Sequence, residues 1–512
     1  MGKNDLLIQN SSNLTSPDTQ GVIATKHNNG SIKNINKMYL LGLLFTISFG
    51  TIQFGYSIGS WNTANDAFVH LQGWEKDSDE GKNYQTLAQS LTTLGAAVGA
   101  LFSGPVLKFG RWKCILFTNL FVIMGAGLTI VSDKTIVLIG RFLYGIACGA
   151  FSVFCPKYIS EVAPTEIKGP AGALSQICIT FGILVPFSIG ILYPSIDDDI
   201  KNQELVNIVF TIPMALAAAQ IVLMVFIYPY DTPVMLKQNG RHEKLREFMC
   251  KIYNPYVVQE RIDEIAVGNL DNTELGGMKD YDIGYSAVCC SPSYTKSTFV
   301  GCALSIFQQL TGINFIMFYS NTLFSNLGMK PQTITGLVGL VNFLTTFGGL
   351  FLLSVAGRRT IMITMSAAMS VILVLNGIFS LNDSSTYAII CTMCFIGAFE
   401  FSSGPITWLY MAEIMQDKAV SIATVLNWVI NLIISLITPS LISAIGKENI
   451  GYIFICCGGF TVLGTLFMIL FMKETRGKTQ AEIEEMFANP ASEEQVLYGK
   501  KIFDASERDN QF

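Results

Sequence analysis

Long apolar runs recur along the chain, each close to the roughly 20 residues that a helix needs to cross a bilayer. Six runs precede a polar interval and six follow it. The predicted spans are 38–60, 84–107, 114–131, 135–160, 170–193, 205–228, 298–324, 334–355, 360–380, 387–412, 419–445 and 451–472. This pattern predicts an all-α membrane protein with twelve transmembrane helices in two pseudo-symmetric six-helix bundles.

The polar intervals divide the chain into five regions. Residues 1–37 are rich in Asn, Ser and Thr and predict a disordered cytoplasmic leader. Bundles of six helices are expected at 38–228 and 298–473, joined by a charged, helix-compatible linker at 229–297. Residues 474–512 form a polar tail, predicted to be cytoplasmic.

Charge supports this layout and sets an orientation. Only 14% of residues are charged, against about 25% in soluble domains. Basic residues favour the cytoplasmic side of membrane proteins, and they gather in the linker (Lys237, Arg241, Lys244) and the tail (Lys473, Arg476). Both termini are therefore expected in the cytoplasm. The net charge of −5 gives no sign of nucleic-acid binding.

The twelve cysteines predict neither a disulfide framework nor a metal site. None lies in a predicted outer loop, where disulfides would be expected. Cys391 and Cys394 have zinc-like spacing, but they lie in an apolar span without a second ligand pair. We expect no cofactor and no metal.

Amide side chains interrupt the seventh span. Gln308, Gln309 and Asn314 lie in an otherwise apolar run, where an unpartnered amide costs several kcal/mol. Each amide offers two donors and one acceptor, which suits a neutral ligand rich in hydroxyl groups. The alternative is that the amides only tie helices together. The grouping of three favours a ligand site.

A weak internal repeat relates the two halves. Arg111 follows the second span and Arg358 follows the eighth, while Glu161 and Glu413 end the fourth and tenth spans. Repeats of this kind are typical of transporters, whose substrate site lies at the interface of the repeats near the bilayer midplane.

The motifs resemble those of sugar porters of the major facilitator superfamily, close to facilitative hexose (glucose) transporters. The resemblance covers about residues 38–487 and is carried by six segments: Gln53–Gly59, Gly140–Gly169, Gln308–Asn314, Glu400–Trp408, Asn427–Trp428 and Glu474–Gly477. It implies hexose transport by alternating access in a monomer, with hexose and the lipid bilayer as partners and the plasma membrane as location. An enzyme is not expected.

The resemblance also implies which residues contact the sugar. Trp408 would offer a flat apolar face to the sugar ring, whereas a lone amide such as Asn342 could equally tie helices together. The implied substrate site comprises Gln176, Gln308, Gln309, Asn314, Asn342, Glu400, Trp408, Asn427 and Asn431.

Other residues are expected to gate the site. Phe318 and Tyr319 would close over the sugar, and Gly312 would let the seventh helix bend. A charged network is expected near the inner ends of the helices, where the alternative is snorkelling of long side chains. Its members by resemblance are Arg141, Glu161, Lys168, Arg358 and Glu413.

Two further expectations concern charges. Lys157 lies four residues before Glu161, so an i,i+4 ion pair is expected. The network is expected to contain fewer charged residues than is usual in the family, because Asp231-Thr232-Pro233, for example, lacks the usual Arg.

Coupling to protons is not expected. Proton-driven members carry an Asp directly after the Phe-Gly-Tyr of helix one, where this chain has Ser57. A midplane carboxylate can cycle a proton, but a hydroxyl cannot. Glu400 is the remaining intramembrane acid. The alternatives are a proton-coupled symporter and a non-transporting sugar sensor on the same fold.

Overall fold

The structure is a computed structural model. It describes residues 35–73, 78–131, 133–164, 167–194, 198–263, 265, 285–323, 330–382, 384–478 and 480–487. The predicted disorder of the leader therefore concerns residues that lie almost entirely outside the described part. Within that part the chain is helical, with one isolated backbone bridge between Ile35 and Tyr253. The prediction of an all-α fold is confirmed.

Six long helices form the N-terminal bundle. They are α2 (Lys37–Leu71), α3 (Asp79–Val106), α4 (Arg111–Ile130), α5 (Lys134–Val162), α6 (Lys168–Leu192) and α7 (Asp199–Phe226). Helix α2 runs eleven residues beyond its predicted end, because polar side chains such as Asn62 and Asn65 are buried against other helices instead of ending the helix.

The C-terminal bundle also has six spans, two of them broken. Its helices are α12 (Thr295–Leu310), α13 (Ile313–Leu323), α14 (Pro331–Val355), α15 (Arg358–Leu381), α16 (Ser385–Phe401), α17 (Ser403–Ile414), α18 (Asp417–Ile445) and α19 (Gly451–Phe471). Gly312, with φ of +86°, separates α12 from α13 and confirms the predicted bend. The described residues contain twelve helical spans long and apolar enough to cross a membrane, as predicted.

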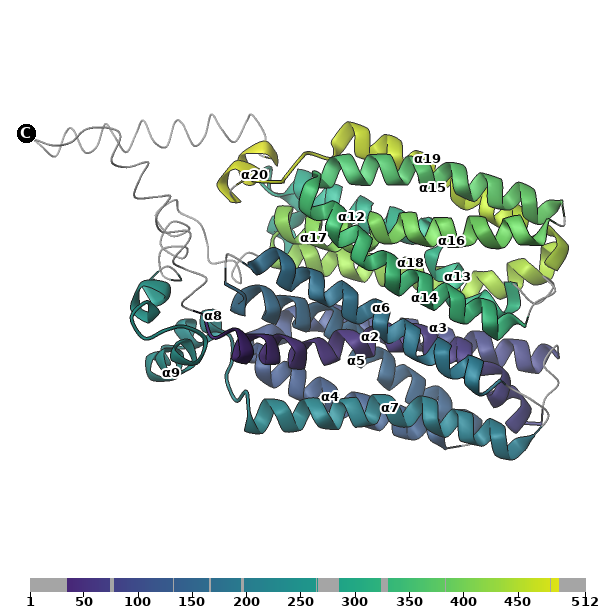
Figure 1. Ribbon diagram of the computed structural model, residues 1–512, viewed down its shortest axis with the longest axis horizontal. Coiled ribbons are helices and arrows are strands. Elements are labelled where there is room, and N and C mark those ends of the chain that lie inside the picture. The colour runs from purple at the N-terminus through teal and green to yellow at the C-terminus, as the bar shows by residue number, and fades with distance from the viewer. Residues whose placement is uncertain are drawn as a thin grey trace, which may run out of the picture.

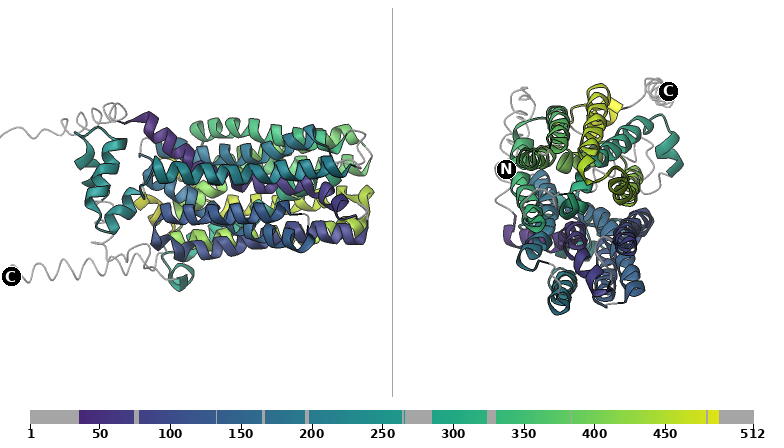
Figure 2. Two further views of the ribbon diagram at one scale, coloured as in Figure 1. Left: turned by 90° about the horizontal axis from the view of Figure 1, so that it is seen from below. Right: turned by 90° about the vertical axis from the view of Figure 1, so that its right-hand side faces the viewer.

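Short helices lie at one end of the bundles (Figure 1). They are α8 (Pro233–Gln238), α9 (His242–Ile252), α11 (Tyr285–Cys290) and α20 (Gln480–Phe487). We call this end the linker face and the opposite end the loop face. Figure 2 shows the two bundles side by side, seen end-on, with α2–α7 in one and α12–α19 in the other.

The two bundles meet mainly through three helix pairs. Helix α3 packs on α18, α6 on α14, and α2 on α13. Within the first bundle, α3 and α5 approach closely because Gly149 lacks a side chain: a Cβ there would lie 1.9 Å from the carbonyl oxygen of Ala96.

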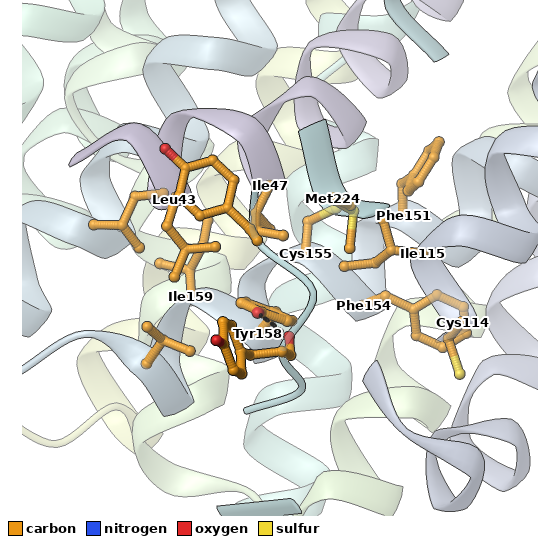
Figure 3. Close-up of a cluster of buried hydrophobic side chains, with 14 of the residues drawn as sticks. Leu43, Ile47, Cys114, Ile115, Phe151, Phe154, Cys155, Tyr158, Ile159 and Met224 are labelled. Carbon is orange, nitrogen blue, oxygen red and sulfur yellow. Dashed lines mark hydrogen bonds between the residues drawn. The ribbon is translucent and has the colours of Figure 1, made fainter. Parts of the chain in front are cut away.

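An apolar core fills the linker-face half of the first bundle (Figure 3). Ile47, Ile115 and Phe151 come from α2, α4 and α5, and all are fully buried. The same cluster includes Phe248 and Ile252 of α9, so the linker helix docks on the bundle by apolar contact. Burial of such side chains contributes about 1.5–3 kcal/mol each.

Candidate functional site

The amides of the seventh span form a hydrogen-bonded cluster with α18. Gln309 Nε2 donates to Asn427 Oδ1 at 2.8 Å, and Asn427 Nδ2 donates to Gln308 Oε1 at 2.8 Å. Asn314 Nδ2 donates to Gln309 Oε1 at 2.6 Å, across the break at Gly312. The break thus lets the Asn314 side chain reach Gln309, five residues earlier, and Asn314 completes the cluster.

A second polar group joins the two bundles. Gln176 Nε2 on α6 donates to Glu400 Oε2 on α16 at 3.1 Å. Thr346 Oγ1 on α14 lies 3.2 Å from the same oxygen and 3.1 Å from Thr180 Oγ1 on α6. The carboxylate of Glu400, only 2% exposed, is therefore held by groups from both bundles.

Between these groups lies a cavity of about 70 Å³. Its walls include apolar side chains such as Phe54, Ile183 and Trp428. Its polar lining comprises all nine residues predicted for the substrate site: Gln176, Gln308, Gln309, Asn314, Asn342, Glu400, Trp408, Asn427 and Asn431. An apolar cavity with a few convergent polar groups is typical of small-molecule sites.

Some polar atoms at this cavity have no partner in the described part of the chain. Both amide atoms of Asn342 and Oδ1 of Asn431 are buried without a hydrogen bond. Buried polar atoms are almost always paired, to protein, water or ligand. These atoms are therefore available to a polar ligand in the cavity.

The cavity is closed toward the loop face. Asn62 Nδ2 on α2 donates to Ser320 Oγ at 2.7 Å and to the carbonyl of Met317 at 3.1 Å, both on α13. Tyr319 donates to the carbonyl of Ser435 at 2.8 Å, and Phe318 is buried. The predicted gate residues Phe318 and Tyr319 thus lie in the closed loop-face half, and α13 is the element that closes it.

Comparisons with known proteins settle the family. Residues 43–487 match the profile of the family described as "Sugar (and other) transporter". The chain belongs to this sugar transporter family. It is an integral, multi-pass membrane protein with a transport function and not an enzyme, as the sequence predicts.

Several relatives of this sugar transporter carry more specific names. It is 29% identical to Hexose transporter 1 of Plasmodium knowlesi over 88% of this chain and 93% of the relative. It is also 29% identical to the glucose transporter GlcP of Staphylococcus epidermidis (87% and 96%) and to the major myo-inositol transporter IolT of Bacillus subtilis (89% and 96%). The xylose symporter XylE, solved with 6-bromo-6-deoxy-D-glucose, has the same fold, with a TM-score of 0.76 at 22% identity, covering 88% of this chain and all of XylE.

At the linker face of the transporter, ion pairs lie within each bundle. Arg111 Nη2 is 2.8 Å from Glu161 Oε1, and Arg358 Nη2 is 3.0 Å from Glu413 Oε1. The predicted pair of Lys157 with Glu161 is confirmed at 3.6 Å. These pairs join helices of one bundle, so a role in holding the two bundles together stays a prediction for another conformation.

Lys168 and Arg141 are the remaining charged residues predicted to gate. The side chain of Lys168 lies outside the described part of the structure. Arg141 was expected near the inner end of its helix, and this placement is wrong. Helix α5 begins at the loop face with Lys134, and Arg141 is only seven residues on, roughly 30 Å from Glu161 along the helix.

Arg141 instead lies in the core of the first bundle. Its guanidinium carbon is 5.0 Å from the ring centre of Trp61 and 5.9 Å from that of Phe210, and the side chain is fully buried. Within the described residues none of its guanidinium nitrogens has a hydrogen-bond partner, so cation–π contact stabilises this charge.

Sequence reasoning noted the segments that begin at Asp231 and Glu474 but missed how four of their residues complete the linker-face network. Asp231 Oδ1 accepts the backbone N–H groups of Arg111 and Trp112 at 3.0 and 3.3 Å, at the start of α4. In the second bundle, the carboxylate of Glu474 accepts those of Arg358 and Arg359 at 2.9 and 3.1 Å.

Each of these acids is followed by a threonine that bonds a glutamate. Thr232 donates to Glu161 at 2.5 Å and Thr475 to Glu413 at 2.6 Å. An acid followed by Thr, just after the sixth and twelfth spans, is the sequence signal that could have revealed both. Burial raises the pKa of Asp231 above its ordinary value.

Proposed function

We propose that this sugar transporter carries a hexose, with D-glucose as the leading candidate, by facilitated diffusion through alternating access. The observation that carries the proposal is the cavity between the bundles, where the amides of Gln308, Gln309 and Asn314 meet Gln176 and Glu400. Neutral donors and acceptors on both sides suit vicinal hydroxyl groups.

Alternating access is supported by how the cavity is enclosed. Toward the loop face it lies beneath the contact of Asn62 with α13. The cavity is not sealed on all sides, because Gln176 and Trp408 in its lining are only half-buried, whereas Gln309 is 5% exposed. Separation of α13 from α2 would open the same cavity to the other side of the membrane.

Transport without ion coupling is supported by Ser57. Its hydroxyl donates to the carbonyl of Phe54 at 2.7 Å, as an ordinary helix hydroxyl does. The second candidate function is proton symport, and one observation favours it: Glu400 is a buried carboxylate at the cavity. Its bonds to Gln176 and Thr346 give it a structural role that needs no proton exchange.

We further propose that the linker face is cytoplasmic, that both termini lie there, and that the protein works as a monomer in the plasma membrane. The cavity lies within one chain, which supports a monomeric unit. The proposed regions are a leader (1–37), two bundles (38–228 and 298–473), a linker (229–297) and a tail (474–512).

The substrate is tested by competition. Uptake of radiolabelled glucose is measured in a cell without its own hexose transporters, in the presence of excess unlabelled glucose, fructose, galactose, xylose or myo-inositol. The proposal expects glucose to compete most strongly. Stronger competition by myo-inositol or xylose than by any hexose would contradict it.

A further inference from the structure

Two adjacent thiols, Cys289 and Cys290, lie at the linker face, and the transport function does not use them. They end α11, and both are exposed. Five residues later, α12 enters the membrane as the first helix of the second bundle. We propose that this pair is a site of S-acylation, at which one or both thiols carry a long-chain fatty acyl group as a thioester.

The backbone around the pair is fixed by contacts to α12. Val288 is fully buried in the apolar core of the second bundle, and its carbonyl accepts a hydrogen bond from Thr298 Oγ1 at 2.9 Å. The carbonyl of Cys289 accepts one from Thr295 Oγ1 at 3.2 Å. Because Val288 anchors α11 on the bundle, the two exposed thiols after it are held beside the first turn of α12.

The neighbouring side chains place this turn at the edge of the lipid. Phe299 is 56% exposed and lies edge-on to Phe467 and Phe471 of α19, with ring centres 5.8 and 6.1 Å apart. Exposed aromatic side chains in a transmembrane bundle face lipid or its interface. Phe299 is four residues, roughly 6 Å, into α12. An acyl chain attached to Cys289 or Cys290 would therefore have lipid within reach.

The chemistry needs only a thiolate and an activated acyl donor. The thiolate sulfur attacks the carbonyl of a long-chain acyl-coenzyme A, the new S–C bond forms, and the coenzyme A thiolate leaves and takes up a proton. No oxidant or reductant is involved. Juxtamembrane cysteines are the usual acceptors of such groups. The acyl transferases act at the cytoplasmic face, so the inference rests on the proposed orientation.

The other described thiols lack this combination of exposure and position. Cys250 is exposed but belongs to α9, which Figure 1 shows beyond the end of the bundle. Two other exposed thiols lie elsewhere: Cys456 is near the loop face, five residues into α19, and Cys394 is nine residues into α16, within the span. Cys114, Cys148, Cys155 and Cys178 are buried. Cys250 is thus the matched control, an exposed thiol on the same side but away from the lipid.

The test is metabolic labelling of the full chain. Eukaryotic cells expressing the tagged protein are fed an alkyne analogue of palmitate, and the purified protein is coupled to a fluorophore with and without hydroxylamine, which cleaves thioesters. We expect label on the wild type that hydroxylamine removes, loss of label in the double variant Cys289→Ser/Cys290→Ser, and full label in Cys250→Ser. Hexose uptake by both variants confirms that they fold.

Three results would overturn the inference. One is label that persists in the double variant. Another is an unlabelled wild type in cells where an established acylated protein is labelled. The third is reaction of Cys250 with a membrane-impermeant maleimide in intact cells, which would contradict the orientation as well. Absence of hexose uptake by the wild type, with labelling as expected, would count against the proposed function and would leave the acylation site unaffected.

Discussion

Tyr158 in α5 and Tyr410 in α17 hold equivalent positions in the two bundles. The hydroxyl of Tyr158 donates to the carbonyl of Tyr230, just after the last helix of the first bundle, at 2.8 Å. The hydroxyl of Tyr410 donates to the carbonyl of Lys473, just after the last helix of the second, also at 2.8 Å. Each tyrosine thus ties the segment that follows the last helix of its bundle to the linker face, beside an acid–threonine pair and a partly buried glutamate–arginine pair.

Removal of either hydroxyl should destabilise the fold. We expect Tyr158→Phe and Tyr410→Phe each to lower the free energy of unfolding by about 1–3 kcal/mol, because each leaves a carbonyl with one hydrogen bond fewer. Thermal stability in detergent, followed by size-exclusion fluorescence, measures this. Tyr256→Phe, at a side chain 93% exposed, is the control and should change nothing. Equal melting temperatures for all three variants would contradict the role.

Asp231 should act through its oxygen acceptor more than through its charge. All its backbone contacts at α4 use Oδ1, which Asn also provides. Asp231→Ala should cost about 1–2 kcal/mol, as expected for loss of a helix cap, and Asp231→Asn should cost less. If the two variants were equally unstable, the charge would be the important feature.

The same residue predicts a pH dependence. Burial raises the pKa of Asp231 above 3.8, so the folded state binds its proton more tightly than the unfolded state does. Its contribution to stability is then fully present below pH 3.8 and falls as pH rises through the raised pKa. The melting temperature of Asp231→Asn minus that of the wild type should therefore be more positive, or less negative, at pH 7 than at pH 4. A difference independent of pH would contradict this.

Close packing of α3 on α5 depends on Gly149. A methyl group there would meet the carbonyl oxygen of Ala96 at 1.9 Å, so the helices must separate. Gly149→Ala should destabilise the protein by about 1–3 kcal/mol and reduce the yield of folded protein. Gly459→Ala in α19 meets nothing within 4 Å and should be neutral or slightly stabilising, by helix propensity. If Gly459→Ala were the more destabilising of the two, close packing of α3 on α5 would not determine stability at Gly149.

Gln309 should control sugar transport. Its side chain links Asn314 and Asn427 at the cavity, so Gln309→Ala removes both hydrogen bonds and leaves these two amides without that link. We expect hexose uptake to fall about tenfold or more, the equivalent of 1.4 kcal/mol, at unchanged abundance in the membrane. Gln238→Ala, an exposed residue of α8, is the control. Normal uptake by Gln309→Ala would show that the amide cluster does not contribute to sugar binding.

Most of the fold could be predicted from the sequence because bilayer thickness fixes the length of an apolar run. The amides of Gln308, Gln309 and Asn314 stand out in an apolar run, and the family resemblance supplied the other six proposed substrate residues. All nine line one cavity, and their contact with sugar stays a prediction. Arg141 was misplaced because a motif gives neighbours along the chain and not depth in the membrane. The contacts of Tyr158 and Asp231 were missed because their partners are backbone groups of residues 70 or more positions away or on a different helix.

Passive hexose transport is the central claim, and sugar accumulation in proteoliposomes tests it most directly. The purified protein is reconstituted, and the internal glucose concentration at steady state is measured with and without an inward proton gradient. We predict that internal glucose rises to the external concentration and no further in both cases, because position 57 carries a hydroxyl in place of a carboxylate. Accumulation above the external concentration, driven by the proton gradient and abolished in Glu400→Gln, would contradict the account.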